Sequence, residues 1–368
     1  MPTISSTRQT NSQATSPTVD RLRTKTLSPA YFALVMATGI VSVAAHQTGM
    51  RWIALALLGL NVVAYPTLLV LTGLRALWYR REFLADLTDH QRGPGFFTAV
   101  AATCLLGSQT LRIVGSVPLA WVFWITGAVL WIVLTYAIFT ALIVKEEKPP
   151  LAEGITGAWL IAVVATQSVA VLSGLLAAHV RQPYRLEMNF LALSMWLWGG
   201  MLYIWMISLI FYRYTFFRFS PADLAPPYWI NMGAMAISTL AGSILIENTP
   251  DAPFLRSMLP FLKGFTVFYW ATGTWWIPML IVLGIWRYIY RRFPVAYDPL
   301  YWGAVFPLGM YAVSTFEMAR ALELEFLSVI PSVFTVLALA AWALTFGALA
   351  RGLWRHALGR TRRSSATV

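Results

Sequence analysis

Hydroxyl side chains and a glycine lie in the middle of long apolar stretches, where a polar solute would find few other partners. Hydroxyl groups can donate and accept hydrogen bonds without carrying a charge, and small residues suit close helix packing or a lumen. A buried Ser or Thr more often bonds a carbonyl of its own helix, so each position also has this second interpretation. The candidates for contact with a solute are Thr38, Gly39, Thr103, Thr166 and Ser238.

Residues for covalent or metal chemistry are not grouped in the sequence. The chain has one cysteine, Cys104, so neither an intramolecular disulfide nor a cysteine metal site is expected. The four histidines are far apart, and neither HExxH nor a phosphate-binding GxxxxGK[ST] loop occurs. We therefore expect no cofactor, no metal and no enzyme activity. The other titratable groups gather toward the far ends of apolar stretches: His46, Arg112, His179, Glu247, Glu317 and Arg320.

The composition indicates which elements must position these residues. Apolar residues make up 58% of the 368 residues and charged residues only 11%, with a mean hydropathy of +0.65. A soluble protein carries about 25% charged residues, and about 20 apolar residues cross a bilayer as a helix. The sequence therefore predicts an all-α membrane protein. Its ten transmembrane helices are expected at 29–47, 52–78, 95–113, 118–144, 153–179, 188–212, 227–247, 258–290, 300–319 and 328–354.

Two tails flank the transmembrane domain, which is expected over residues 28–356. Residues 1–27 are rich in Ser, Thr, Gln and Pro and are expected to form a disordered tail, while 357–368 form a basic tail. Of the 27 Lys and Arg residues, 20 fall on the side of the tails and 7 on the other side. Positive charge stays cytoplasmic, so both termini are expected there. The net charge of +12 reflects this orientation, and no nucleic-acid partner is expected.

The odd-numbered spans begin alike, which indicates an internal repeat. Four starts read Pro-x-aromatic-aromatic and end at Phe32, Phe97, Trp229 and Trp302, while the third keeps only Trp159. Proline suits a first helical turn, and aromatic rings anchor at the membrane interface. The sequence therefore predicts five tandem helical hairpins, whose parallel odd helices could close into a ring around a common axis.

Residue size predicts which helix of each hairpin faces that axis. Fourteen of the seventeen tryptophans lie in even spans or at their edges, whereas small residues are concentrated in the odd spans. The expected arrangement is an inner ring of five odd helices around a pore and an outer ring of five even helices. The alternative is that the small residues only allow tight packing, without a pore.

The expected solute of such a pore is a small anion. Five parallel helices would point their N-termini at the cytoplasmic mouth, and each N-terminus carries roughly half a positive charge. The basic cytoplasmic edge would add to this attraction. No carboxylate is expected at mid-depth, which favours passive conduction over strong proton coupling.

Two segments resemble a known family. The run PAYFALVMATGIVS, residues 29–42, is similar to the first span of the tellurite-resistance/dicarboxylate transporter family, and YWGAVFPLG, residues 301–309, is similar to its ninth span. This family lies in the voltage-dependent anion channel superfamily and includes TehA, yeast malate and sulfite transporters and plant slow anion channels. The resemblance covers residues 28–355.

The resemblance implies a ring of five inner helices around a central pore, commonly in a homotrimer with one pore per subunit. It also implies that a phenylalanine of the ninth span plugs the pore. The matching residue is Phe306, and the adjacent Pro307 would bend its helix and could aim the ring at the axis. Ordinary packing of Phe306 is the alternative.

Two functions remain open at this point. The first is a Phe-gated path for small anions, such as C4-dicarboxylates, chloride, nitrate, sulfite or tellurite. The alternative is a proton-coupled carrier of dicarboxylates or other organic acids. The expected partners are the anionic solute, the lipid bilayer and further copies in a homotrimer, and the expected location is the cell membrane. The aromatic eighth span is expected to face lipid or another subunit.

Overall fold

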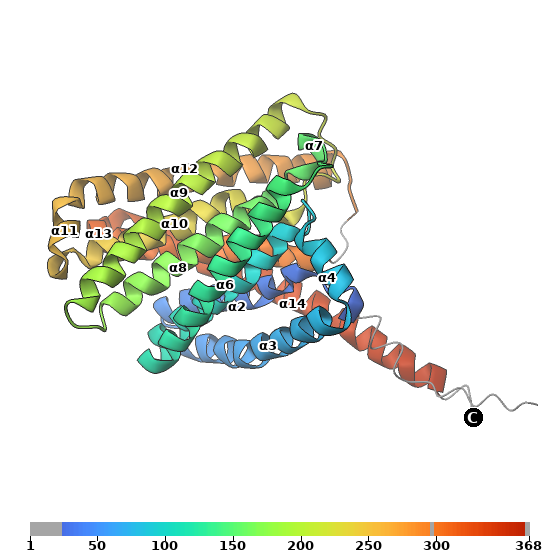
Figure 1. Cartoon of the computed structure of the whole chain (residues 1–368), viewed down its shortest axis with the longest axis horizontal. Helices are drawn as coiled ribbons and strands as arrows, with labels where there is room; N and C mark the ends of the chain where they lie inside the picture. Colours follow the sequence, from blue (N-terminus) through green and yellow to red (C-terminus); the bar gives the residue numbers. More distant parts are fainter. Residues whose placement is uncertain (1–23, 295–297, 365–368) are drawn as a thin grey trace, which may run out of the picture.

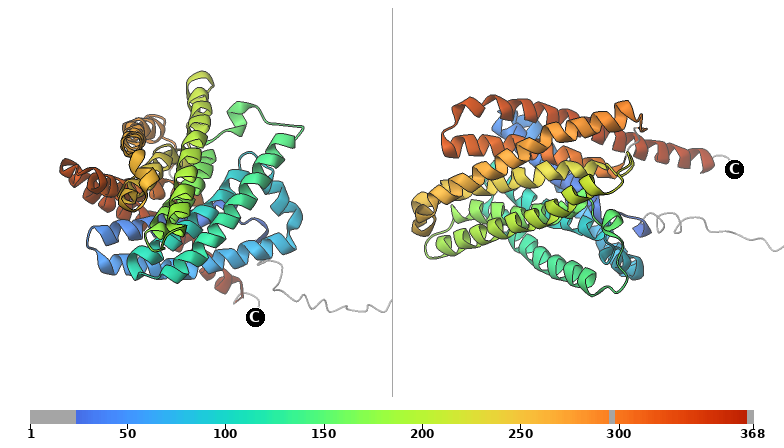
Figure 2. Two further views of the ribbon diagram at one scale, coloured as in Figure 1. Left: turned by 60° about the vertical axis from the view of Figure 1, so that its left-hand side comes forward. Right: turned by 90° about the horizontal axis from the view of Figure 1, so that it is seen from above.

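A computed structural model describes residues 24–294 and 298–364. Regular structure within these ranges is helical, and the long helices form one bundle (Figures 1 and 2). Most of the predicted N-terminal tail lies outside the described residues. The α-helices are α2 (Ala33–Gln47), α3 (Arg51–Trp78), α4 (Arg80–Leu87), α5 (Phe97–Gln109), α6 (Val117–Val144), α7 (Leu151–Gly154), α8 (Ile161–Ala177), α9 (Tyr184–Phe216), α10 (Ile230–Glu247), α11 (Pro253–Ser257), α12 (Leu259–Ile285), α13 (Trp302–Leu322) and α14 (Val329–Ser364).

Nine helical segments of the described chain are long and apolar enough to cross a membrane. They correspond to nine of the ten predicted spans, and the fold class of an all-helical membrane protein is thereby confirmed. The predicted ninth span, which holds α13, is not among them, because Glu317, Pro307 and its glycines and tyrosines lower its mean hydropathy. Since α13 nevertheless packs against α2, α10 and α14, the count of ten stays a prediction.

Each odd-numbered span begins with a 3-10 turn, a feature that the sequence pattern did not predict. Polar side chains start three of these turns: Ser28, Thr156 and Asp298 accept hydrogen bonds from the N–H two residues on, at 3.3, 3.3 and 2.8 Å. The turns contain most of the Pro-x-aromatic-aromatic motif. They are η1 (Pro29–Phe32), η2 (Gly93–Phe96), η4 (Gly157–Leu160), η5 (Pro226–Trp229) and η8 (Pro299–Tyr301).

The helices that follow these turns are the inner helices. Between 78% and 94% of the residues in the first, third, fifth and seventh spans are buried, against 22–44% in the even-numbered spans. Each inner helix contacts the next one in chain order, from α2 through α5, α8 and α10 to α13, and α13 contacts α2. These contacts are the ones that a closed inner ring requires, with α3, α6, α9, α12 and α14 as outer helices. That the ring surrounds a solute path stays a prediction.

The last helix continues through the predicted boundary between the membrane domain and the basic tail. α14 runs without interruption to Ser364, and its final part projects from the bundle (Figure 1). The first residues of the predicted tail at 357–368 therefore extend the last span as a helix, and no break in the helix marks residue 356.

One glycine allows the starts of two neighbouring inner helices to approach closely. A Cβ atom at Gly157 in η4 would lie 2.7 Å from the backbone oxygen of Pro227 and 2.7 Å from the Cα of Tyr228 in η5. Backbone atoms cannot rotate away as side chains can, so a methyl group here would push the two turns apart. Gly264 of α12 provides the contrast, because a Cβ there would meet no atom within 4 Å.

We expect Gly157→Ala to destabilise the protein by about 1–3 kcal/mol, as overpacking of a dense interior does. Gly264→Ala should leave stability unchanged or raise it slightly, because alanine favours helix over glycine. The thermal unfolding midpoint of the purified protein in detergent measures both effects. Equal midpoints for the two variants would show that η4 and η5 separate freely and would contradict this account of the packing.

Candidate functional site

An open cavity of about 460 Å³ lies where the five inner helices begin. Each of the 3-10 turns contributes a residue to its wall, namely Ala30, Gly95, Ala158, Pro227 and Leu300. A cavity walled by all five turns lies on the common axis of the inner helices. We call this cavity the axial mouth.

A second cavity, of about 10 Å³, continues the axial mouth to greater depth. The two cavities share lining residues, among them Ala30 and Ile161. A cavity needs roughly 10–15 Å³ to hold one water molecule, so the axial opening narrows to about the size of a single water. All five inner spans again contribute to the lining, through Ala33, Thr98, Ile161, Ile230 and Gly303.

Phe306 follows the narrow cavity along α13. Residues three apart lie on the same face of a helix, so Phe306 lies one turn beyond Gly303 on the face that lines this cavity. Its side chain is completely buried. The next residue, Pro307, packs against α10, where a Cβ at Gly233 would lie 2.8 Å from the Pro307 Cγ. Phe306 therefore lies directly beyond the narrow cavity, on the face of α13 that lines it. Its role as a plug stays a prediction.

Three of the hydroxyl groups predicted to meet a solute bond instead to aromatic side chains of the outer helices. Each is buried, and each partner comes from a different outer helix, so the hydroxyls lie between the inner and outer rings. These contacts do not favour the predicted pore lining. The pairs are the Trp342 indole N–H donating to Thr38 at 2.9 Å, the Trp131 indole N–H donating to Thr166 at 2.8 Å, and the hydroxyls of Tyr65 and Thr103 at 2.7 Å.

The other two candidates also lie away from the axial cavities. The Ser238 hydroxyl donates to the Ala234 carbonyl at 2.8 Å, which is the local bond of the second interpretation. A Cβ at Gly39 would lie 3.2 Å from the Asn61 amide nitrogen of α3. The position of a residue within an apolar stretch predicts its depth in the membrane. The rotation of the helix about its own axis decides whether the side chain faces the ring axis or an outer helix, and the sequence did not predict this rotation.

The repeated motif at the start of the odd spans marks the residues that line the narrow cavity. In four of the five repeats the lining residue directly follows the last aromatic residue of the motif, as Ala33 follows Phe32 and Gly303 follows Trp302. In the third repeat Ile161 follows Trp159 by two residues, because η4 extends one residue past this tryptophan. Small or apolar side chains, rather than hydroxyls, thus surround most of the narrow cavity.

The opposite ends of the inner helices carry a network of paired charges. Glu317 of α13 is almost completely buried, and one of its oxygens accepts hydrogen bonds from Arg112 and, at 2.7 Å, from the Gln47 amide. Arg320 lies 2.9 Å from the other Glu317 oxygen and donates to Glu247 at 2.6 Å. The sequence identified four of these residues separately. Only their pairing shows that the carboxylate of Glu317 lies between two guanidinium groups.

Charges of both signs line the axial mouth, since Arg92 and Asp298 both lie in its wall. The neighbouring His90 lies close to Lys145 and Lys148. Burial lowers the pKa of His90 and the two lysines lower it further, against the opposing effect of Asp89. The inner helices also begin here, with the positive ends of their dipoles. Among the described residues, no three His, Cys, Asp or Glu side chains form a group that could hold a metal ion.

Several known proteins are similar to this chain, some of them over most of its length. The family described as voltage-dependent anion channel matches residues 26–350. An uncharacterized membrane protein of Mycobacterium tuberculosis is 38% identical over 167 residues, which are 45% of this chain and 84% of that protein. An uncharacterized transporter of Methanocaldococcus jannaschii is 26% identical over 327 residues, 87% of this chain and 92% of that protein.

A sulfite efflux pump of Arthroderma otae is also similar, at 22% identity over 346 residues, 86% of this chain and 88% of that protein. The resemblance predicted from residues 29–42 and 301–309 is therefore confirmed. Because the family match spans all five inner helices and the axial cavities that they line, the chain belongs to the voltage-dependent anion channel family.

Proposed function

We propose that this protein conducts small anions passively along the axis of its inner helices, and that Phe306 closes this path. The observation that carries the proposal is the axial mouth, which all five inner helices line. It narrows from about 460 Å³ to about 10 Å³ at the helical turn before Phe306. A hydrophobic constriction blocks ions by excluding the water that they need, and the phenyl ring of Phe306 has this chemistry.

The mouth supports anions over cations as the solute. The positive ends of the inner helices raise the local concentration of anions there. The similarity to a sulfite efflux pump makes sulfite the first anion to test. Chloride, nitrate, tellurite and the larger dicarboxylate malate are the further candidates, and their flux can be compared in the same liposomes.

The paired charges at the far end support passive conduction over proton coupling. A proton carrier needs a carboxylate that can lose and regain its proton, whereas Glu317 lies between Arg112 and Arg320. We therefore take a channel or facilitator as the function and a proton-coupled carrier of organic acids as the alternative.

We place the protein in the cell membrane with both termini in the cytoplasm, following the distribution of Lys and Arg. We also propose a homotrimer with one axial path per subunit. The outer helices could provide the surfaces for lipid and for neighbouring subunits, because α12 exposes Phe265, Phe268 and Trp275. Chemical crosslinking in native membranes would count the subunits.

Phe306→Ala should raise anion conductance per molecule several-fold in proteoliposomes, because it removes the apolar ring and adds no charge. Phe97→Ala is the matched control: Phe97 is a buried ring of an inner helix, but it packs against Phe139 of the outer helix α6. Removal of a packed phenylalanine costs about 3–5 kcal/mol, so Phe97→Ala should lower stability without raising conductance. A folded Phe306→Ala protein with unchanged conductance would assign Phe306 to packing.

Cysteine accessibility tests whether Phe306 separates the mouth from the deeper path. In a Cys104→Ala background, Met310→Cys should react with a small water-soluble thiol reagent only when Phe306→Ala is also present, since Met310 lies one turn beyond Phe306 on the same face. Thr315→Cys of the same helix should stay unreactive, because Thr315 accepts a hydrogen bond from Trp270 of α12. Reaction at both positions at equal rates would contradict an axial path.

The driving force for flux distinguishes a channel from a coupled carrier. We expect a membrane voltage alone to drive anion flux in proteoliposomes, and a pH gradient at zero voltage to drive none. Empty liposomes provide the baseline. Flux that requires the pH gradient would replace our proposal by the proton-coupled carrier.

A further inference from the structure

Three arginines are buried in the described part of the chain, and they differ in their partners. Arg75 pairs with Asp86 at 2.5 Å, and Arg213 pairs with Asp223 at 3.2 Å. The third, Arg287, lies in the π-helical turn η7 (Trp286–Tyr290) at the end of α12, with an exposed fraction of 8%. No carboxylate of the described residues lies within ion-pair distance of it, and its Nε–H has no acceptor among them.

Burial of a charge without a partner is costly, and removal of one partner from a buried pair strongly destabilises a protein. The contacts of Arg287 are aromatic: its guanidinium carbon lies 5.0 Å from the ring centroid of Tyr288 and 4.4 Å from that of Phe293. Such cation–π contacts stabilise the charge but accept none of its five N–H donors. The guanidinium therefore retains its full capacity to bind an oxyanion.

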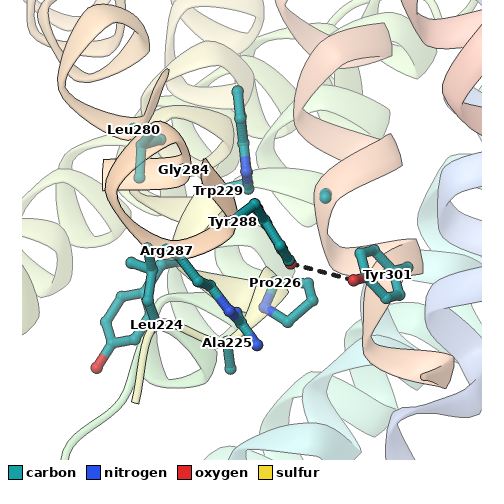
Figure 3. A pocket seen from close by; sticks show the side chains of 11 residues that line it. Leu224, Ala225, Pro226, Trp229, Leu280, Gly284, Arg287, Tyr288 and Tyr301 are labelled. Carbon is teal, nitrogen blue, oxygen red and sulfur yellow. Dashed lines mark hydrogen bonds between the residues drawn. The ribbon is translucent and has the colours of Figure 1, made fainter. Parts of the chain in front are cut away.

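A cavity of about 90 Å³ lies beside Arg287 (Figure 3). Its wall comes from three parts of the chain: η5 and the residues before it, the end of α12 with η7, and the start of the ninth span at Tyr301 and Ala304. The volume is well above the roughly 10–15 Å³ that admits one water. It shares no lining residue with the axial mouth, so it is a separate site on the outer side of the inner helices.

A second donor faces this cavity. The hydroxyls of Tyr288 and Tyr301 lie 3.1 Å apart and bond to each other (Figure 3). Two hydroxyls have two hydrogens, and the bond between them uses one. The other hydrogen is free to be donated, so the cavity combines a guanidinium fork with a phenolic O–H.

We propose that this cavity binds a phosphate group through Arg287, with Tyr288 and Tyr301 as the second donor. A guanidinium matches phosphate oxygens with two parallel hydrogen bonds. The group could be the headgroup of an anionic lipid, since η7 ends a membrane span on the predicted cytoplasmic side, where anionic lipids are concentrated. It could equally be free phosphate, and the experiment separates the two sources.

The position of the site gives it a role beyond the proposed conduction. It joins the outer segment η7 to Tyr301, which lies in η8 directly before α13 and five residues before Phe306. A phosphate group held by both elements stabilises their contact and so favours the arrangement in which Phe306 is buried. The site is therefore a regulatory anion site, distinct from the path of the transported solute.

The test uses the full chain and measures binding, not flux, so its result does not depend on the proposed conduction. One arm titrates delipidated protein in detergent with inorganic phosphate and follows the thermal unfolding midpoint. The other arm omits phosphate and counts retained lipids by native mass spectrometry, after exchange into phosphatidylglycerol or phosphatidylcholine. The variants are Arg287→Gln and the control Arg291→Gln, which removes an exposed charge of the same segment.

We expect wild type and Arg291→Gln to bind phosphate, phosphatidylglycerol or both, and Arg287→Gln to lose at least tenfold in affinity. Saturation by inorganic phosphate alone identifies the free ion as the ligand, and retention of phosphatidylglycerol alone identifies the lipid. Tyr301→Phe, which keeps the ring but removes the hydroxyl, should weaken binding several-fold. It replaces Arg287→Gln as the test variant if Arg287→Gln folds poorly. Equal binding by all variants, or no binding by wild type in either arm, would overturn the proposal.

Discussion

The hydrocarbon interior of a bilayer offers no water to a polar group, so buried hydroxyls need partners within the protein. Several of these hydroxyls have tryptophans of the outer helices as partners, because an indole presents one N–H donor on a large apolar ring. The N–H of Trp131 reaches Thr166, and in the same way Trp270 reaches Thr315. These bonds hold the hydroxyls of Thr166 and Thr315 toward the outer helices. The narrow axial cavity is lined mainly by small and apolar side chains.

The two ends of the inner helices follow different electrostatic designs. At the mouth, the inner helices present the positive ends of their dipoles, while Arg92 and Asp298 of the lining carry opposite charges. At the far end, Glu317 and Glu247 pair with Arg112 and Arg320, so positive and negative charges balance. Under the proposed conduction, an anion would meet the positive helix ends first, then the apolar narrowing and finally the balanced network. This order suits selection at the entrance and closure inside.

Two of the three buried arginines of the described chain are paired with carboxylates. Asp86 joins Arg75 to Arg92 near η2, and Asp223 joins Arg213 to the loop before η5. Both pairs lie at the ends of the inner helices where the axial mouth opens, and they hold the turns that line it. Arg287 departs from this rule at the same edge of the bundle, and the departure is what distinguishes a site for an external anion from a structural ion pair.

The sequence by itself determined the helical membrane class, the tandem hairpins and the alternation of inner and outer helices, because bilayer thickness and residue size leave few other solutions. It also placed Phe306 and Pro307 in the ninth span through the family resemblance. It did not determine which way each inner helix is turned. Thr38, Thr103 and Thr166 lie at suitable depths, yet a rotation of the helix decides whether a hydroxyl meets the axis or an outer tryptophan. Two further features depend on segments that are distant in the sequence. Arg112 pairs with Glu317, which is 205 residues away, and Arg287 has no carboxylate within ion-pair distance among the described residues. Only tertiary packing brings such segments together or keeps them apart.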